Sequence, residues 1–384
     1  MDYISRIIEA EVRILENHFP VITLTGPRQS GKTTLAKQLY PELPYFNFEN
    51  PDLRLIANGD PRAFLTPIQQ GAIFDEVQHV PELLSYLQQI VDDNRSNSRF
   101  ILTGSNQFEL LGKTVQSLAG RTALLKLLPL SLEELKGHYN LNTNRLILNG
   151  FYPGLYNQNI DPIRFYRNYY ETYLERDLRQ MVQVKDLSMF QKFIRLCAGR
   201  TGNIFNASAI ANEVGVATNT IQAWMSVLEA SYVVMLLRPY YKNIGKRLIK
   251  SPKIYFYDVG LAAYLLGIEN ENQLSRDPLR GALFENMVIM EMIKYRYNRG
   301  SDHQLYYYRD SHHNEIDIVF EKAGDFHAIE IKSAQTFHTD FLKGFRTSPG
   351  PSEKLIKTVC YDGEYEGTIN DCQLLNFRNI SGVL

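Results

Sequence analysis

Short apolar stretches alternate with helix-forming stretches in the first third of the chain. Predominantly apolar runs of strand length occupy residues 21–24, 72–74, 99–102 and 123–128, and a helix-forming run occupies residues 34–39. Buried parallel strands have this continuous apolar character, because helices cover both faces of their sheet. The pattern predicts an α/β multidomain protein with a parallel-sheet core at its N-terminal end.

The first apolar run leads into a glycine-rich sequence of the form G-x-x-x-x-G-K-[ST]. Its members are Gly26, Pro27, Arg28, Gln29, Ser30, Gly31, Lys32 and Thr33, and Thr34 follows. Glycines in such a loop let backbone N–H groups surround phosphate oxygens, while Lys32 reaches the β and γ phosphates and Thr33 offers its hydroxyl to Mg²⁺. The sequence therefore predicts a nucleoside triphosphate site, with an ordinary glycine turn as the alternative.

The second apolar run ends in two acids, Asp75 and Glu76. In a P-loop site, the first acid holds the magnesium shell and the second orients the attacking water. A strand followed by a helix cap is the alternative.

Polar residues also follow the third apolar run, and an arginine precedes the fourth. Ser105 and Asn106 are candidates to sense the γ-phosphate or the attacking water, although both residue types also cap helices. Arg121 is a candidate arginine finger, which often acts across a subunit boundary and would imply a homo-oligomer. An arginine in a surface ion pair explains the same residue equally well.

The order of these motifs resembles that of the AAA+ ATPases. It is similar in particular to a bacterial and archaeal group in which the ATPase module is joined to a C-terminal domain of unknown function. The similarity continues through residues 149–153 and 173–178, and it implies ATP as the nucleotide. A GTPase is disfavoured because the chain contains no Asn-Lys-x-Asp sequence, whereas a small-molecule P-loop kinase remains open on the first motif alone.

Composition adds limits to this interpretation. The chain has 384 residues, 44% hydrophobic and 22% charged, with a formal net charge of −1. This length favours several domains, and the charge means that any nucleic-acid contact must be local. Three separated cysteines, Cys197, Cys360 and Cys372, offer no disulfide framework. With no apolar stretch of about 18 residues, we expect a cytoplasmic protein that makes no membrane contact.

The middle of the chain carries a helix-turn-helix spacing at residues 207–224 and a β-prone stretch at 231–237, as in a winged helix. Thr218, Asn219 and Gln222 begin the second helix, where such modules contact DNA. A basic segment follows, and its screened cations are candidates to attract phosphates. These cations are Arg238, Lys242, Lys246, Arg247, Lys250 and Lys253. A module that contacts protein is the alternative.

Dispersed charged residues mark the C-terminal part. Their order resembles the PD-(D/E)xK nuclease fold: Glu285 in a helix-like run, Asp317 in one β-prone strand, and Glu330 and Lys332 on one face of the next strand. In that fold, Asp317 and Glu330 would bind Mg²⁺, Lys332 would assist catalysis, and Glu285 could complete the metal site. Surface charges on an unrelated sheet, or a nuclease-like fold that does not cleave, are the alternatives.

Four domains are expected: an ATPase core at 1–130, a helical lid or connector at 131–185, a winged-helix-like domain at 186–250 and a nuclease-like α/β domain at 251–384. Two functions remain open. One is an ATP-hydrolysing enzyme coupled to DNA binding or processing. The other is a nucleotide-gated interaction switch with a non-cleaving C-terminal domain.

Overall fold

The computed structural model describes residues 3–68, 70–93, 99–105, 118–174, 187–241, 251–310, 312, 314–346 and 355–384. The chain forms two compact units. Unit 1 comprises Met1–Leu130, Ala230–Tyr232 and Tyr297–Ser301, and unit 2 comprises Ser131–Glu229, Val233–Arg296 and Asp302–Leu384.

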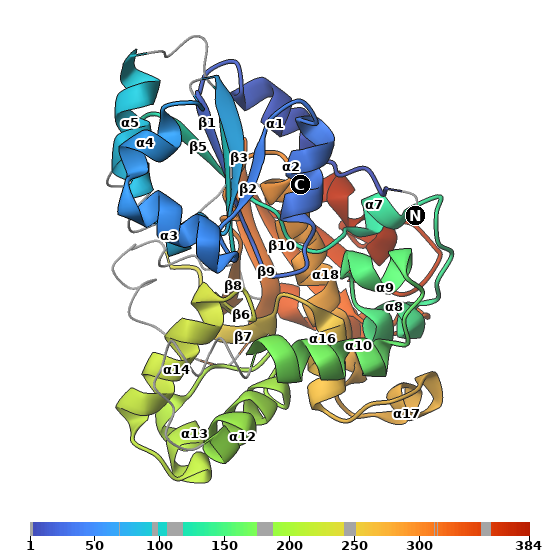
Figure 1. Ribbon diagram of the computed structural model, residues 1–384. Coiled ribbons are helices and arrows are strands. Elements are labelled where there is room, and N and C mark those ends of the chain that lie inside the picture. The colour runs from blue at the N-terminus through green and yellow to red at the C-terminus, as the bar shows by residue number, and fades with distance from the viewer. Residues whose placement is uncertain are drawn as a thin grey trace. The chain divides into compact units, whose positions relative to one another are not determined.

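Unit 1 is built on a parallel five-stranded sheet in the order β2-β3-β4-β1-β5 (Figure 1). Its strands are β1 (Val21–Thr25), β2 (Tyr45–Asn47), β3 (Gly71–Asp75), β4 (Arg99–Gly104) and β5 (Thr122–Lys126). Its helices are α1 (Glu9–Leu15), α2 (Lys32–Leu39), α3 (Pro51–Gly59), α4 (Pro61–Leu65), η1 (Val77–His79) and α5 (Leu83–Asp93). The parallel-sheet core predicted from the apolar runs is confirmed.

Helices cover both faces of this sheet, which explains why its strands are apolar throughout. On β4, Phe100 and Leu102 belong to the core formed with α3, α4 and α5. Ile101 points the opposite way, into the core formed with α1 and α2. Successive strand residues alternate between the two faces. Since both faces are covered, the carboxyl ends of the strands are left to carry polar chemistry, as in other open α/β sheets.

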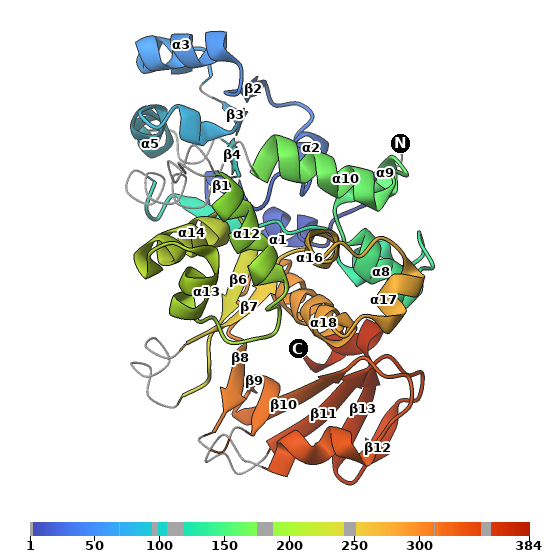
Figure 2. The same ribbon diagram turned by 90° about the horizontal axis from the view of Figure 1, so that it is seen from below.

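Unit 2 begins with short helices and continues into a group of helices beside a two-stranded hairpin (Figure 2). The first helices are α7 (Leu132–Leu135), α8 (Thr143–Asn149), α9 (Pro153–Asn157), α10 (Pro162–Tyr169) and the π-helical turn η2 (Tyr170–Leu174). The helices near the hairpin are α12 (Leu187–Ala198), α13 (Ala207–Val214) and α14 (Thr218–Ala230). The hairpin consists of β6 (Val234–Leu237) and β7 (Lys253–Phe256).

The remainder of unit 2 contains a mixed six-stranded sheet in the order β12-β13-β11-β10-β9-β8 (Figure 2). Its strands are β8 (Tyr306–Arg309), β9 (Glu315–Lys322), β10 (Asp325–Lys332), β11 (Leu355–Tyr361), β12 (Gly367–Ile369) and β13 (Cys372–Asn376). The accompanying helices are α16 (Val259–Leu265), α17 (Glu271–Arg276), α18 (Arg280–Tyr297), η3 (Thr339–Arg346) and η4 (Phe377–Val383). The described residues therefore form a large mixed sheet in addition to the parallel sheet of unit 1.

Two short sequence patterns determine local structure in unit 2. Ser131 and Glu134 form a reciprocal capping box at the start of α7. Between β9 and β10, Ala323 and Gly324 both have positive φ, 53° and 90°. A two-residue hairpin loop needs such values, because its twist must match that of the strands.

Among the described residues, every helix is too short or too polar to cross a membrane. The three cysteines are buried free thiols, and burial raises the pKa of the Cys372 thiol to about 11. A buried thiol with a raised pKa is a poor nucleophile.

Gly150 ends α8 at a crowded place. Its φ of 62° and ψ of −156° lie in a region that is nearly exclusive to glycine. A Cβ there would lie 2.0 Å from the Tyr166 hydroxyl and 2.3 Å from Asp258 Oδ1. Asp258 accepts hydrogen bonds from the Tyr166 hydroxyl at 2.6 Å and from the Phe151 N–H at 2.7 Å. The glycine therefore allows a buried carboxylate to join α8, α10 and α16.

We expect Gly150→Ala to destabilise unit 2 by about 3 kcal/mol, because the methyl group adds steric overlap to an unfavourable backbone conformation. Gly137→Ala is the matched control. Gly137 has a φ of 88°, but a Cβ at this position would have no neighbouring atom within 4 Å. This control should cost only about 1 kcal/mol. Urea unfolding of both variants measures the difference, and equal costs would contradict the packing described around Gly150.

Candidate functional site

The loop between β1 and α2 has the backbone conformation that its glycines were expected to provide. Gly26, Gln29 and Gly31 have positive φ values of 146°, 61° and 97°. A Cβ on Gly26 would lie 2.1 Å from the Leu127 carbonyl oxygen, so only glycine fits beside the end of β5. The loop then enters α2 at Lys32. An N-terminus of this kind directs backbone N–H groups toward an anion.

Lys32 lies within this loop and is 5% exposed. Its ammonium donates to the carbonyl oxygens of Gly26 at 2.9 Å and of Pro27 at 2.8 Å. Burial lowers its pKa to about 8, against the opposing effect of the Glu76 and Asp75 carboxylates. A buried ammonium held by neutral carbonyl groups is well suited to pair with a polyphosphate.

The other P-loop residues have varied surroundings. Pro27 and Ser30 are buried, and the Ser30 hydroxyl has no hydrogen-bond partner within the part of the chain that the structure describes. Arg28 forms an ion pair with Glu49 at 3.0 Å. Thr34 is exposed on the first turn of α2. The loop thus combines a buried backbone path with polar groups at its surface.

Arg6 stabilises the loop through hydrogen bonds, a role that no sequence motif indicates. This arginine is 5% exposed. Its guanidinium donates to the Ser30 carbonyl at 2.8 Å and to the Leu128 carbonyl at 2.7 Å. It therefore ties the phosphate loop to the chain that leaves β5.

Asp75 ends β3 opposite the loop and accepts several hydrogen bonds. The Thr33 hydroxyl lies 3.1 and 3.0 Å from its two carboxylate oxygens. The Tyr45 hydroxyl donates to it at 2.7 Å, and the Thr103 hydroxyl also donates to it. The structure thus brings together the predicted pair Thr33 and Asp75. It adds Tyr45 and Thr103, which the sequence interpretation did not assign to the site.

Glu76 follows Asp75 in a left-handed conformation, with φ at 53°. Its carboxylate accepts hydrogen bonds from the Ser105 hydroxyl at 3.0 Å and from Gln78. Burial raises its pKa, but the Lys32 ammonium and the Gln78 hydrogen bond outweigh burial, so the pKa is lowered overall. Glu76 is therefore ionised at neutral pH and linked to Ser105, one of the two sensor candidates. The other, Asn106, lies outside the described residues.

Arg121 lies just before β5, where it pairs with Asp92 through two hydrogen bonds of 2.6 and 2.8 Å. The register pairs Val21 with Thr122 and Thr25 with Lys126, so Arg121 and the P-loop lie at opposite ends of β1. Five strand residues span about 15 Å. Arg121 therefore cannot reach the P-loop of its own chain from this position, and any finger role would require a neighbouring subunit.

Three of the predicted C-terminal site residues meet on the β9–β10 hairpin. Lys332 lies 2.5 Å from Glu330 and 3.5 Å from Asp317, and Asp317 also accepts a 2.8 Å hydrogen bond from the Ile331 N–H. Glu330 is 4% exposed, and its Oε1 has no hydrogen-bond partner within the described part of the chain. Burial, followed by the Asp317 carboxylate, raises the pKa of Glu330.

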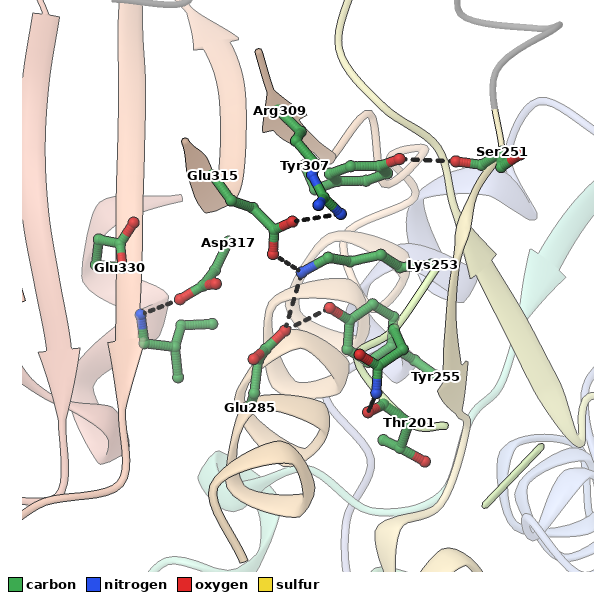
Figure 3. Close-up of polar contacts among 12 residues, drawn as sticks. Thr201, Ser251, Lys253, Tyr255, Glu285, Tyr307, Arg309, Glu315, Asp317 and Glu330 are labelled. Carbon is green, nitrogen blue, oxygen red and sulfur yellow. Dashed lines mark hydrogen bonds and ion pairs between the residues drawn. The ribbon is translucent and has the colours of Figure 1, made fainter. Parts of the chain in front are cut away.

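Glu285, the fourth residue of the predicted set, has different partners. It lies on α18 and accepts a hydrogen bond from Tyr255 (Figure 3). The Lys253 ammonium lies 3.6 Å from it. Burial, followed by the nearby Asp317 carboxylate, raises the pKa of Glu285 to about 7. Across the described ranges, no three His, Cys, Asp or Glu side chains are arranged to hold a metal ion. The structure therefore does not join Glu285 to Asp317 and Glu330 in one ligand set.

The residues proposed for nucleic-acid contact are only partly described. Asn219 and Gln222 are exposed on the first turns of α14, and Thr218 is partly exposed. Lys242, Lys246, Arg247 and Lys250 lie outside the described residues. The expectation that Lys253 is a solvent-screened cation is wrong: it is 2% exposed and forms an ion pair of 2.5 Å with Glu315. Its place in a strand beside two partly buried acids, Glu285 and Glu315, explains the difference.

Comparison with protein families divides the chain into three matched regions. Residues 18–136 match the AAA domain family. Residues 140–272 and 280–380 match two further families, described as domains of unknown function DUF8612 and DUF4143. Together with the P-loop geometry, the first match defines the N-terminal unit as an AAA-type P-loop ATPase domain, a fold that implies nucleotide binding.

Relatives that match most of the chain show its family. Uncharacterized protein Rv2008c of Mycobacterium tuberculosis and Uncharacterized protein Mb2031c of Mycobacterium bovis are each 32% identical over 368 residues, covering 94% of this chain and 81% of the relative. A Haemophilus influenzae protein is 24% identical over 344 residues, covering 80% and 81%. The chain belongs to the same family as the mycobacterial proteins.

Solved structures show more distant similarity. The Walker-type ATPase PABY2304 of Pyrococcus abyssi has a TM-score of 0.47 at 16% identity, covering 67% of this chain and 94% of that protein. The Thermotoga maritima RuvB Holliday junction branch migration motor has a TM-score of 0.28 at 17% identity, covering 60% and 86%.

We expect Glu76→Gln to reduce the rate of ATP hydrolysis at least about 100-fold while leaving ATP affinity within a few-fold of wild type. The amide still fills the site but cannot act as a base toward water. Phosphate release and nucleotide binding, measured on the same samples, test this. Glu82→Gln, at an exposed position, is the matched control. Near-normal hydrolysis by the Glu76 variant would overturn the assignment.

The lowered pKa of Lys32 predicts a pH dependence of ATP binding. Above pH 8 the free protein loses the ammonium, whereas a bound triphosphate favours it. The association constant should therefore fall as pH rises, by up to about tenfold per pH unit. Calorimetric titrations between pH 7.5 and 9.5 measure the slope. Lys32→Met should bind weakly with no such slope, and an equal slope in that variant would assign the effect to another group.

Proposed function

We propose that this protein is a Mg²⁺-dependent AAA+ ATPase that couples ATP hydrolysis to DNA binding and processing. In this proposal, α12, α13, α14 and the β6–β7 hairpin act as a winged-helix-like DNA-binding module. The C-terminal sheet domain acts as a nuclease-like module of the PD-(D/E)xK type. The observation that supports the nuclease part is a buried carboxylate oxygen of Glu330, which has no hydrogen-bond partner among the described residues. Burying such an atom is costly unless a ligand forms a bond with it.

Mg²⁺ prefers oxygen ligands. The residues of the N-terminal site suit it, whereas the C-terminal site offers two carboxylates that also contact Lys332. In unit 1, the Thr33 hydroxyl and the Asp75 carboxylate lie within 3.1 Å of each other and would hold the ion. In unit 2, Asp317 and Glu330 would hold it. A bound Mg²⁺ would neutralise charge on phosphate oxygens at either site.

The chain's own groups would perform the remaining steps of ATP hydrolysis. Lys32 would release the loop carbonyls and pair with the β and γ phosphates. Glu76 would orient the attacking water. Ser105, which donates a hydrogen bond to Glu76, would sense the γ-phosphate or that water. Arg121 would have to exchange its pair with Asp92 for a nucleotide on a neighbouring subunit.

DNA contact is supported by the exposed polar side chains at the start of α14. Asn219 and Gln222 project from the first turns of the second helix in a helix-turn-helix spacing, where such modules reach bases or phosphates. The net charge of −1 requires that attraction to DNA come from local cations.

A second candidate function is a nucleotide-gated interaction switch whose C-terminal domain does not cleave. The contacts of Glu285 favour it, because Tyr255 and Lys253 already engage the carboxylate that could complete a metal site. This alternative predicts ATP-dependent assembly that DNA does not affect.

We expect ATPase activity stimulated by DNA, with Mg²⁺-dependent strand scission. Purified full-length protein with ATP and Mg²⁺ is tested against single-stranded, duplex and branched DNA, and phosphate release and strand scission are read together. Asp317→Asn should abolish scission and keep ATPase activity, whereas Asp325→Asn, on the same hairpin, should keep both. Scission that survives the Asp317 change would remove the nuclease proposal. A rate of ATP hydrolysis that none of the DNA substrates changes would favour the interaction switch.

A further inference from the structure

Tyr232 follows α14 in a backbone conformation that usually belongs to glycine. Its φ is 54°. The Val233 N–H donates to the Leu228 carbonyl at 2.9 Å, which is the bond that closes a Schellman motif, with Ser231 as the C-cap and Tyr232 as the left-handed residue after it. This conformation is unfavourable for a residue that has a Cβ. Such strain persists where surrounding contacts compensate for it, so the Tyr232 side chain is expected to make a contact that glycine cannot.

The Tyr232 side chain makes that contact with the strand that leads into the phosphate loop. Tyr232 belongs to unit 1, whereas most of α14 and all of β6 belong to unit 2. The residue is 1% exposed, and its hydroxyl lies 2.9 Å from the hydroxyl of Thr25, which is also fully buried. Burial raises the pKa of Tyr232 to about 12, so the hydroxyl keeps its proton at neutral pH. A buried hydrogen bond therefore joins the end of α14 to β1.

Thr25 is the last residue of β1 and directly precedes Gly26, the first residue of the phosphate loop. Its backbone carbonyl accepts a hydrogen bond from the Leu127 N–H at 2.8 Å. The Gly26 carbonyl accepts one from the Lys32 ammonium at 2.9 Å. Pairing of Lys32 with phosphates breaks the bond to Gly26. The contacts of Thr25 then hold this end of β1, so the Tyr232 hydroxyl stabilises the ATP-bound loop more than the free loop.

We propose that Tyr232 is a positioning residue that couples the phosphate loop to α14. This inference rests on ATP binding in the proposed function, and not on DNA binding or cleavage. Energetic coupling between two sites is reciprocal. Because the Tyr232 hydroxyl strengthens ATP binding, ATP strengthens the hydrogen-bonded cap that holds Tyr232. Occupancy of the nucleotide site thereby reaches the end of the helix whose first turns carry Asn219 and Gln222.

Amide hydrogen exchange of the full chain, with and without Mg²⁺ and a non-hydrolysable ATP analogue, tests the coupling. Saturating analogue should slow exchange of the wild-type Val233 amide, which closes the cap, by about fivefold, as expected for one buried hydrogen bond. Tyr232→Phe keeps the ring but lacks the hydroxyl, and should show no such slowing at saturation. Its affinity for the analogue, measured by calorimetry, should be lower by a similar factor.

Two further variants serve as a second test and a control. Thr25→Val removes the same hydrogen bond from the other partner and should cause both losses. Adding Tyr232→Phe to it should lower the affinity no further, because the two changes remove one interaction. Tyr40→Phe is the matched control, since Tyr40 is also buried in unit 1 and its hydroxyl donates to Glu16 at 2.5 Å. It should keep the affinity and the exchange response of wild type.

A Tyr232→Phe protein that is less stable in urea but keeps the wild-type affinity and exchange response would overturn the proposal, because a purely structural role gives that result. Should Tyr232→Phe fail to fold, Thr25→Val decides: loss of the exchange response supports the coupling, and its retention overturns it. Wild-type protein that binds the analogue and hydrolyses ATP with no change at Val233 would overturn the coupling alone. Wild-type protein that binds no nucleotide would overturn the proposed ATPase as well.

Discussion

The conformation of the loop between β1 and α2 is the constraint on which the ATPase unit depends. Gly26 and Gly31 have positive φ, and the close approach of Gly26 to Leu127 excludes any side chain. Because β1 lies between β4 and β5 in the sheet, this loop and the ends of the neighbouring strands meet at one edge. Asp75 and Ser105, which are distant in sequence from the loop, thereby come to the same place.

Buried charge is the second organising feature, and it recurs in both units. Lys32 is buried near Asp75 and Glu76, while Lys253 is buried against Glu285 and Glu315. Charges removed from water need partners of the opposite sign. The lysines differ in what holds them. Lys32 donates to neutral carbonyls and is available to a phosphate, whereas Lys253 is already paired with carboxylates.

Local signals in the sequence are sufficient for the features that depend on neighbouring residues. The phosphate loop, the acids at the end of β3, the capping box at Ser131 and the turn at Gly324 all follow from patterns a few residues long. Lys332 and Glu330 are also in contact as expected, because alternate strand residues share a face.

Residues whose roles depend on long-range packing cannot be found in this way. Arg6 contacts carbonyls 24 and 122 positions away, and Tyr45 meets Asp75 across 30 positions. The prediction for Lys253 is wrong because the residue comes at the end of a basic segment of the sequence. Its burial results from contacts of β7 with elements that are distant in the sequence. Nothing in the local pattern distinguishes it from the lysines that precede it.

The most direct test of the central claim is a calorimetric titration of the full-length protein with ATP in the presence of Mg²⁺, alongside Lys32→Ala. Saturable heat with one ATP bound per chain, lost in the variant while its fold is kept, is the predicted result. A well-folded wild-type protein that gives no heat with ATP or ADP would contradict the account.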